Sequence, residues 1–458
     1  MGFTKLIERT FRRFLPSPFT IAVLLTVLTI SLALIFGQAP SEGNKLFHTL
    51  KLWEQGVWNN GLLVFAYQMM LILVLGHVLV LSKPMELLIL RLTGMVQNSA
   101  NAAILVALPT MLVSFFNWGL GLIFGALLAR KVGEYAQSKN IPINYPLIGA
   151  CGYVGLMVWH GGISGSAPLK VSEEGHLAAL LSGFQDQSLI DAIPLLISTS
   201  ETVFSLSNLI IFTVVLLSIT ILVHYLGKKA KPTHLDLAIY HFREKDPNTY
   251  TGAERLDHSK MLSLVFGLLI LAAFLVQYLP FLQKLNLTPN LLNFFMLGLA
   301  IVLHGSFSNF LRAVEDAIAD VSGILIQFPL YFGIMGVMGG SGIIGQISDF
   351  FVSISTATTL PIFTFLSAGL VNVFVPSGGG QWAVQGPLVL ESALSLGVPL
   401  PKAIMALAYG DQLTNMLQPF WALPLLGITK LKAKEILPYT LLFMAVGGAI
   451  YLVGLLLF

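Results

Sequence analysis

The chain alternates long apolar stretches with short polar ones, and the apolar stretches are long enough to cross a lipid bilayer. A crossing helix needs about 20 apolar residues, because the hydrocarbon core is roughly 30 Å thick. The pattern therefore predicts about nine transmembrane helices and an all-α membrane protein. These crossings are expected at residues 18–37, 62–82, 146–163, 203–226, 260–280, 290–311, 321–345, 403–427 and 436–458.

Two further apolar segments, 99–130 and 358–392, are interrupted in the middle. The first is interrupted at Asn117, and the second at a run of Pro, Ser and three Gly residues that ends at Gly380. Gly and Pro permit a tight turn that a helix does not continue, so we expect each segment to form a re-entrant hairpin. Irregular backbone at membrane depth is tolerated only against protein or a water-filled cavity. The two hairpin tips are therefore predicted to line a site.

Two of the predicted crossings contain an unusual density of polar residues and glycines. In the first, the apolar stretch runs into the string from His160 to Ser166. In the second, the string from Tyr409 to Pro419 lies inside the span. Such residues in an apolar helix favour a discontinuous helix. We therefore predict broken helices at 146–166 and 403–427, which would meet the hairpin tips near the middle of the membrane.

The positions of Lys and Arg predict the orientation, because these residues are enriched in cytoplasmic loops. Loops expected inside by this criterion are the N-terminus, 83–91, 130–139, 227–258 and 430–434. Loops with few or no basic residues, expected outside, are 38–60, 164–202, 346–357 and 388–401. The polar linker 227–258 then divides the chain into two halves, 1–226 and 259–458, and the N-terminus is predicted to be cytoplasmic.

The two halves align with each other. The string from Leu112 to Phe116 matches that from Leu370 to Phe374, and Ile141-Pro142 matches Val398-Pro399. The basic turn 130–139 then matches a lysine-free stretch in the second half. Equivalent loops therefore lie on opposite sides, which is the signature of inverted-topology repeats. The helix at 260–280 supplies the extra crossing that the inversion requires.

Composition agrees with this picture: 55% of the residues are hydrophobic and only 10% are charged, against roughly 25% charged in a soluble domain. The single cysteine, Cys151, makes no intrachain disulfide. No phosphate-binding P-loop string is present, which argues against ATP-driven transport within the chain. The sequence contains no HExxH string or Cys cluster. It therefore predicts no metal centre, cofactor or nucleic-acid partner.

The sequence resembles the prokaryotic short-chain fatty acid transporters associated with uptake of acetoacetate and butyrate. The resemblance covers essentially the whole chain, and its most specific strings run from Phe11 to Pro18, from Val375 to Trp382 and from Gly410 to Asn415. It implies a place among ion-coupled carboxylate transporters of the inner membrane, an elevator-like motion and a homodimer. Several relatives carry a Ser-Asn-Thr string at the tips that helps bind sodium, and this chain lacks it.

A carboxylate inside a membrane needs partners, because an unpaired ion costs several kcal/mol there. Backbone N–H groups at a helix N-terminus neutralise an anion without a formal charge, and the glycine run at the second tip would supply them. The alternative is that these glycines only make the turn. The predicted substrate-binding residues are Asn117, Trp118, Gly119, Ser377, Gly378, Gly379, Gly380, Gln381 and Asn415.

Asp411 is a carboxylate in the middle of an apolar span, where ionisable groups are costly and usually functional. We predict that Asp411, Thr414 and His160 bind the coupling proton or sodium ion. The alternatives are that Asp411 caps the broken helix, that His160 is a neutral hydrogen-bonded side chain, and that Thr414 joins neighbouring helices.

The leading hypothesis is secondary active uptake of a short-chain monocarboxylate by proton or sodium symport across the bilayer. One alternative is transport of another small organic anion. An intramembrane enzyme that pairs Asp411 with His160 is a second alternative, although no nucleophile or metal motif accompanies the pair. A channel is the third.

Overall fold

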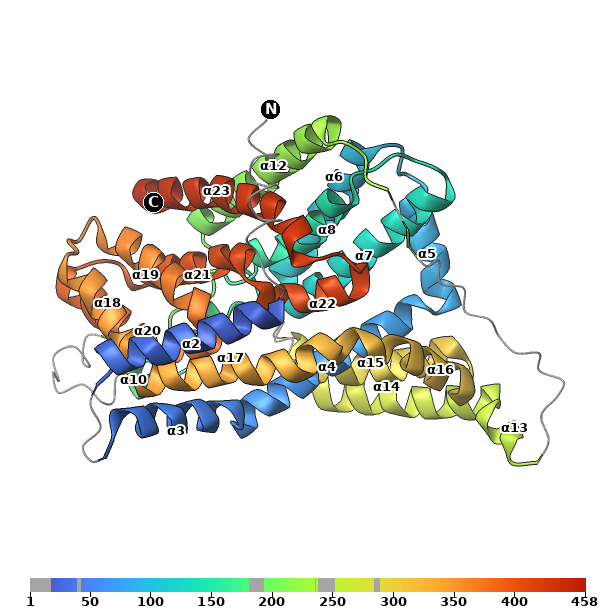
Figure 1. The fold of residues 1–458 in the computed structure, drawn as a ribbon, viewed down its shortest axis with the longest axis horizontal. Helices are drawn as coiled ribbons and strands as arrows, with labels where there is room; N and C mark the ends of the chain where they lie inside the picture. Colours follow the sequence, from blue (N-terminus) through green and yellow to red (C-terminus); the bar gives the residue numbers. More distant parts are fainter. Residues whose placement is uncertain (1–17, 39–42, 181–192, 235, 238–251, 284–288) are drawn as a thin grey trace.

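The computed structural model describes residues 18–38, 43–180, 193–234, 236–237, 252–283 and 289–458, and all regular secondary structure in these ranges is helical (Figure 1). The prediction of an all-α chain is therefore confirmed. The basic residues that place the N-terminus, and part of the linker 227–258, lie outside the described residues.

Several of these helices are long and apolar. Four have the length and composition to cross a membrane, and a bent pair within 45–79 makes a fifth. The four are α6 (Ser99–Phe116), α12 (Leu206–Lys229), α14 (Lys260–Gln283) and α23 (Ala433–Leu457). Shorter apolar helices fill most of the other predicted spans. A multi-pass membrane protein is thus supported, while the number of about nine crossings stays a prediction.

Two predicted spans are divided. Residues 290–311 form α15 (Pro289–His304) and α16 (Phe307–Ala317), separated at Gly305, whose φ of 67° is left-handed. Residues 321–345 form α17 (Ser322–Gly340) and the start of α18 (Ile343–Ser353), separated at Gly342 with a φ of 75°. A residue in this region of φ ends a helix, and glycine adopts it without strain.

Each half of the chain is a series of helices. The first half contains α2 (Pro18–Phe36), α3 (Lys45–Val57), α4 (Asn60–Val80), α5 (Lys83–Thr93), α6, α7 (Trp118–Ser138), α8 (Tyr145–Tyr153) and α12. The second half contains α15 to α18, α19 (Leu360–Phe374), α20 (Gly378–Leu396), α21 (Leu400–Thr414), α22 (Pro419–Thr429) and α23. Helix α14 stands between the two series. The inverted orientation of the halves stays a prediction.

Both interrupted segments form a pair of helices with the break at the predicted position. Helices α6 and α7 are antiparallel, because Gly121 lies against Ser114 and Gly125 lies against Thr110. Helix α7 continues to Ser138, beyond the predicted limit at 130. Helices α19 and α20 are joined by residues 375–377. The term re-entrant, which concerns the membrane, stays a prediction.

Both segments predicted as broken helices are interrupted. Helix α8 ends at Tyr153, passes into the 3₁₀ turn Val154–Met157, and is followed by irregular backbone and the short α9 (Ser166–Lys170). Helix α21 is followed by the 3₁₀ turn Asn415–Leu417 before α22 begins. We refer to residues 158–167, which follow the first break, as the central segment.

Several segments predicted as loops are largely helical: residues 83–91 lie in α5, 346–353 in α18 and 388–396 in α20. Residues 38–60 were expected to form an outside loop, but α3 occupies most of this range and packs along α17 (Figure 1). Lys51 and Glu54 lie on the exposed face of α3, while Gly56 is buried. The charges that indicated a loop therefore belong to one face of an amphipathic helix.

The packing of α3 on α17 predicts a contrast between two glycines of α17. A Cβ at Gly336 would lie 2.5 Å from the carbonyl oxygen of Leu52 and 2.8 Å from the Cα of Gly56, whereas a Cβ at Gly339 meets nothing within 4 Å. Gly336→Ala should therefore destabilise the protein by about 1–3 kcal/mol, the usual cost of overpacking. Gly339→Ala should be neutral or slightly stabilising. Thermal unfolding in detergent compares the two, and equal melting temperatures would contradict the close packing.

Candidate functional site

The first hairpin tip is fastened to the central segment. Asn117 ends α6 and caps α7, where its side-chain oxygen accepts the N–H of Leu120 at 2.8 Å. The backbone N–H of Trp118 donates to the hydroxyl of Ser164 at 2.9 Å. One of the free N–H groups expected at the start of α7 is therefore already occupied by a side chain of the central segment.

The second hairpin tip rests on the same segment but leaves its N–H groups open. Ser377 caps α20, because its hydroxyl accepts the N–H of Gly380 at 3.2 Å. The N–H groups of Gly378 and Gly379 have no hydrogen-bond partner among the described residues. A Cβ at Gly378 would lie 2.7 Å from the Trp159 ring and 2.8 Å from that of His160. A Cβ at Gly379 would make only ordinary van der Waals contact, with the side chain of Ser166 nearest at 3.9 Å.

The central segment carries one half of a buried acid–base pair. His160 Nδ1 lies 2.5 Å from Asp411 Oδ2, and both side chains are fully buried. The other ring nitrogen, Nε2, accepts the backbone N–H of Ala167 at 3.0 Å. A backbone N–H can only donate, so Nε2 holds a lone pair and the proton of the neutral ring is on Nδ1. His160 therefore donates to Asp411, and the contact fixes the tautomer.

Asp411 has a second oxygen, Oδ1, that is buried without a hydrogen-bond partner among the described residues. The amide of Asn372 donates to the backbone carbonyl of Asp411 at 2.7 Å, and its nitrogen also contacts oxygens of Thr414 and Asn415 at 2.9 Å. The side-chain oxygens of Asn372 and Gln418 are likewise buried and unpaired in the described structure. Neighbouring residues therefore present several buried acceptor oxygens that have no hydrogen-bond partner among the described residues.

Aromatic rings cover one side of this region. The Trp118 ring lies 6.0 Å from Trp159 and 5.1 Å from Trp421, measured between centroids. Trp159 stacks on His160 with a centroid separation of 4.5 Å. The first tip, the central segment and α22 thus contribute an apolar wall next to the second tip.

The structure brings most of the predicted site residues together around the central segment. Trp118, Gly378 and Gly379 lie against the central segment, where His160 contacts Asp411. Thr414 and Asn415 contact Asn372, which also contacts the backbone of Asp411. The remaining residues, Asn117, Ser377 and Gly380, form the two tips themselves. Gly119 follows Trp118, and a Cβ there would lie 3.5 Å from the Asn117 side chain.

Gln381 is directed away from the second tip. Its amide nitrogen donates to the carbonyl of Ala368 at 2.9 Å and to Gln385 at 2.7 Å, so it joins α19 to α20. Trp382 is also remote from the aromatic wall, since its indole donates to His176 at 3.0 Å and its ring packs with Leu177. Trp382 therefore belongs to a different cluster of side chains from Trp118.

Several residues that connect the site were not singled out from the sequence. Gln412 accepts the N–H groups of His160 and Gly161 at 2.8 and 3.0 Å. Asn208 donates to the carbonyl of Gly161 at 2.8 Å and accepts the hydroxyl of Tyr409 at 2.8 Å. Polar residues in apolar helices were the available signal, because membrane interiors seldom contain them without a partner.

Comparison with known proteins agrees with the resemblance noted from the sequence. The family model described as "Short chain fatty acid transporter" matches residues 2–458. A protein of Escherichia coli named "Putative short-chain fatty acid transporter" is 35% identical over 472 residues, which cover 99% of each chain. A protein of the same name from Haemophilus influenzae is 34% identical over 450 residues, covering 97% of this chain and 96% of that one.

Two solved structures are distantly similar. The YdaH transporter of Alcanivorax borkumensis has a TM-score of 0.45 and 16% identity, over 96% of this chain and 97% of that one. MtrF of Neisseria gonorrhoeae has a TM-score of 0.40 and 16% identity, over 97% of this chain and 96% of that one. The sequence matches alone decide the assignment, because they extend over the whole length at higher identity. The chain belongs to the short-chain fatty acid transporter family.

Proposed function

We propose that this protein is a secondary active transporter that imports short-chain monocarboxylates, such as acetoacetate or butyrate, together with a proton or a sodium ion. Its family is one of transporters and not of enzymes. The observation that carries the proposal is the meeting of both hairpin tips with the central segment, beside the buried pair of His160 and Asp411.

In this proposal the substrate carboxylate binds at the second tip. The N–H groups of Gly378 and Gly379 are unpaired at the start of α20, where the helix dipole also favours an anion. Gly379 lies beside Ser166, whose hydroxyl is a further donor, and a Cβ there would be uncrowded. The acyl chain would lie against the indoles of Trp118 and Trp159. A short acyl chain fits this wall best, because the rings of Trp118, Trp159 and Trp421 limit the space beside it.

The coupling ion would bind at Asp411. Its unpaired Oδ1 is suited to a proton, and the neighbouring oxygens of Asn372 and Gln418 are suited to a hard cation such as sodium. His160 holds the other carboxylate oxygen in place. Thr414 lies beside these oxygens, because its hydroxyl contacts the amide nitrogen of Asn372. The oxygens at this site therefore suit either a proton or a sodium ion as the coupling ion.

The membrane arrangement is part of the proposal. The hairpins 99–130 and 358–392 are re-entrant, the halves 1–226 and 259–458 are inverted repeats, and the linker 227–258 and the N-terminus face the cytoplasm. Transport across the inner membrane proceeds by an elevator-like motion, and the protein is a homodimer. The aligned strings 112–116 and 370–374 and the charge pattern of the loops support the repeats.

Purified protein in liposomes tests the function directly. Labelled butyrate or acetoacetate should accumulate above the external concentration when an inward proton or sodium gradient is imposed, and an ionophore that dissipates the effective gradient should abolish accumulation. Uptake that ignores both gradients would refute symport. Single-channel currents would favour a channel, and preference for an unrelated organic anion would favour the other transporter hypothesis.

A further inference from the structure

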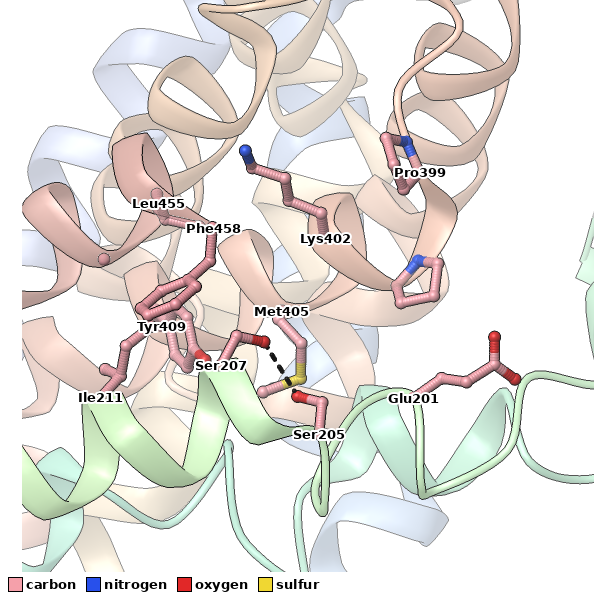
Figure 2. Close-up of a pocket in the computed structure, with 12 residues that line it drawn as sticks. Glu201, Ser205, Ser207, Ile211, Pro399, Lys402, Met405, Tyr409, Leu455 and Phe458 are labelled. Atoms are coloured by element: carbon pink, nitrogen blue, oxygen red, sulfur yellow. Dashed lines mark hydrogen bonds between the residues drawn. The ribbon is translucent and has the colours of Figure 1, made fainter.

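A cavity lies between the start of α12, the start of α21 and the end of α23 (Figure 2). Its volume is about 170 Å³, which is room for several waters at about 30 Å³ each and hence for a short acid. Lys402, Pro399 and Pro401 come from one wall, and Glu201 stands on another. Glu201 and Pro399 belong to the segments 164–202 and 388–401, which were predicted to face outside.

The cavity combines one cation with an apolar floor. The side chain of Lys402 forms no ion pair or hydrogen bond with any residue that the structure describes. The floor contains Met405 and Tyr409, and Leu455 and Phe458 close the side. An unpaired ammonium above apolar side chains matches a molecule with a carboxylate at one end and a short hydrocarbon chain at the other. Glu201 would repel the carboxylate of the bound molecule, so the carboxylate would bind on the opposite wall beside Lys402.

Only one layer of side chains separates this cavity from the site around His160. A Cβ at Gly161 would lie 3.3 Å from the Tyr409 ring and 3.5 Å from the Met405 methyl group, so both residues touch the central segment from the cavity side. The Tyr409 hydroxyl donates to Asn208, which in turn holds the carbonyl of Gly161. Met405 is flexible and unbranched, which suits a side chain that can move aside.

We propose that this cavity is an outer binding site where a short-chain carboxylate waits on Lys402 before it passes Met405 toward the hairpin tips. The inference rests on the proposed function and adds a second substrate site to it. Lys402 attracts the anion, and the apolar floor selects a short acyl chain. Occupation of this site and occupation of the second tip are separate events.

Thiol protection tests the site without relying on transport. The native Cys151 is buried, so a cysteine placed at Ser207 on the cavity wall can be labelled selectively. Ser207→Cys leaves the α12 cap intact, because Ser205 provides it. Butyrate should slow the reaction of Ser207→Cys with a charged thiol reagent, while neutral butyramide should not. Lys402→Ala should remove the protection, and Lys402→Arg should restore it.

Two lysine variants distinguish binding of butyrate in the cavity from a general attraction of the anion to a positively charged surface. Lys402→Ala should raise the KM for butyrate uptake about tenfold, the effect of removing one charge-assisted hydrogen bond, with a small change in the maximal rate. Lys170→Ala removes the same charge from the end of α9, where Lys170 is exposed and paired with Glu173. The KM of Lys170→Ala should stay at the parent value.

The two proposals fail in different ways. Protection should persist when Gly379→Val disables the second tip, because the cavity binds independently. Loss of protection in that background, or equal protection by butyramide, would overturn the outer site. If the parent protein accumulates butyrate but butyrate never protects Ser207→Cys, the outer site is refuted and the proposed function stands. If the parent accumulates no carboxylate, the proposed function itself fails.

Discussion

Asp411→Asn should abolish ion-driven accumulation of substrate while leaving the protein folded and able to exchange substrate across the membrane. The asparagine oxygen can still accept the proton of His160 Nδ1. The variant therefore keeps a hydrogen bond in place of the contact that measures 2.5 Å in the parent. The amide cannot take up a proton or balance a cation as the carboxylate does. The substrate concentration inside the liposomes should therefore rise only to the external concentration, whichever ion gradient is imposed.

Two measurements define this result. Counterflow of labelled butyrate should stay within about twofold of the parent, as expected for a nearly isosteric change, and accumulation should vanish. Asp411→Ala is the contrast, because it leaves the buried Nδ1–H of His160 unpaired and should cost about 1–3 kcal/mol of stability. Gradient-driven accumulation by Asp411→Asn at the parent level would show that Asp411 serves only to hold His160.

Gly379→Ala should weaken substrate binding at least about tenfold, since the attraction between an anion and a helix N-terminus is worth up to about 2 kcal/mol. The structure leaves room for the new methyl group, whose nearest neighbour is Ser166 at 3.9 Å. The fold should therefore be unchanged, and the methyl group should occupy the space proposed for the carboxylate. Gly379→Val should enlarge the effect.

The first tip supplies a matched control. A Cβ at Gly119 would also make only ordinary contacts, 3.5 Å from Asn117 and 3.9 Å from Ile72. The Trp118 N–H beside it already donates to Ser164, so Gly119→Ala should change affinity by less than about twofold. Butyrate-dependent thermal stabilisation measures both variants. Equal losses of affinity would place the carboxylate between the tips, and no loss in Gly379→Ala would remove the second tip from the site.

The positions of the helix breaks could be predicted from the sequence because they depend on local chemistry. Asn117 accepts an N–H three residues ahead, and Ser377 does the same before a run of glycines. Capping side chains and residues that leave a helix easily are visible in a single sequence. Both hairpin tips were therefore predicted at the residues where the structure has them.

The connections of the site could not be predicted in the same way. Asn372 and Asp411 are 39 positions apart, and His160 and Asp411 are 251 positions apart. Their contacts depend on how whole helices pack, which no local pattern contains. The three contacts of Asn372 join α19 to the end of α21 and the turn that follows it. The side-chain oxygen of Asn372 is buried without a hydrogen-bond partner among the described residues, which suits it to bind a cation. This burial results from the packing of the surrounding helices, so the sequence alone did not indicate it.

The error at α3 has a physical origin too. Lys51 and Glu54 lowered the hydrophobicity of the segment below that of a membrane span, and a polar loop was the simplest interpretation. The buried stripe that includes Thr49, Gly56 and Val57 is narrow and made mostly of small residues. Small residues allow close helix packing without adding much hydrophobicity. A pattern based on hydrophobic span length therefore misses such a helix.

The hydrogen bond from Ala167 to His160 has a further consequence. Because Nε2 accepts this N–H, the backbone of α9 determines the orientation of the imidazole ring. In the same stretch, Ser164 accepts the N–H of Trp118 at the first tip, and Ser166 is the nearest neighbour of a Cβ at Gly379 at the second tip. The four residues from Ser164 to Ala167 therefore link the imidazole ring to both hairpin tips. Any free energy by which a ligand at one tip shifts this stretch must equal the free energy by which the shifted stretch changes the affinity of that tip for the ligand.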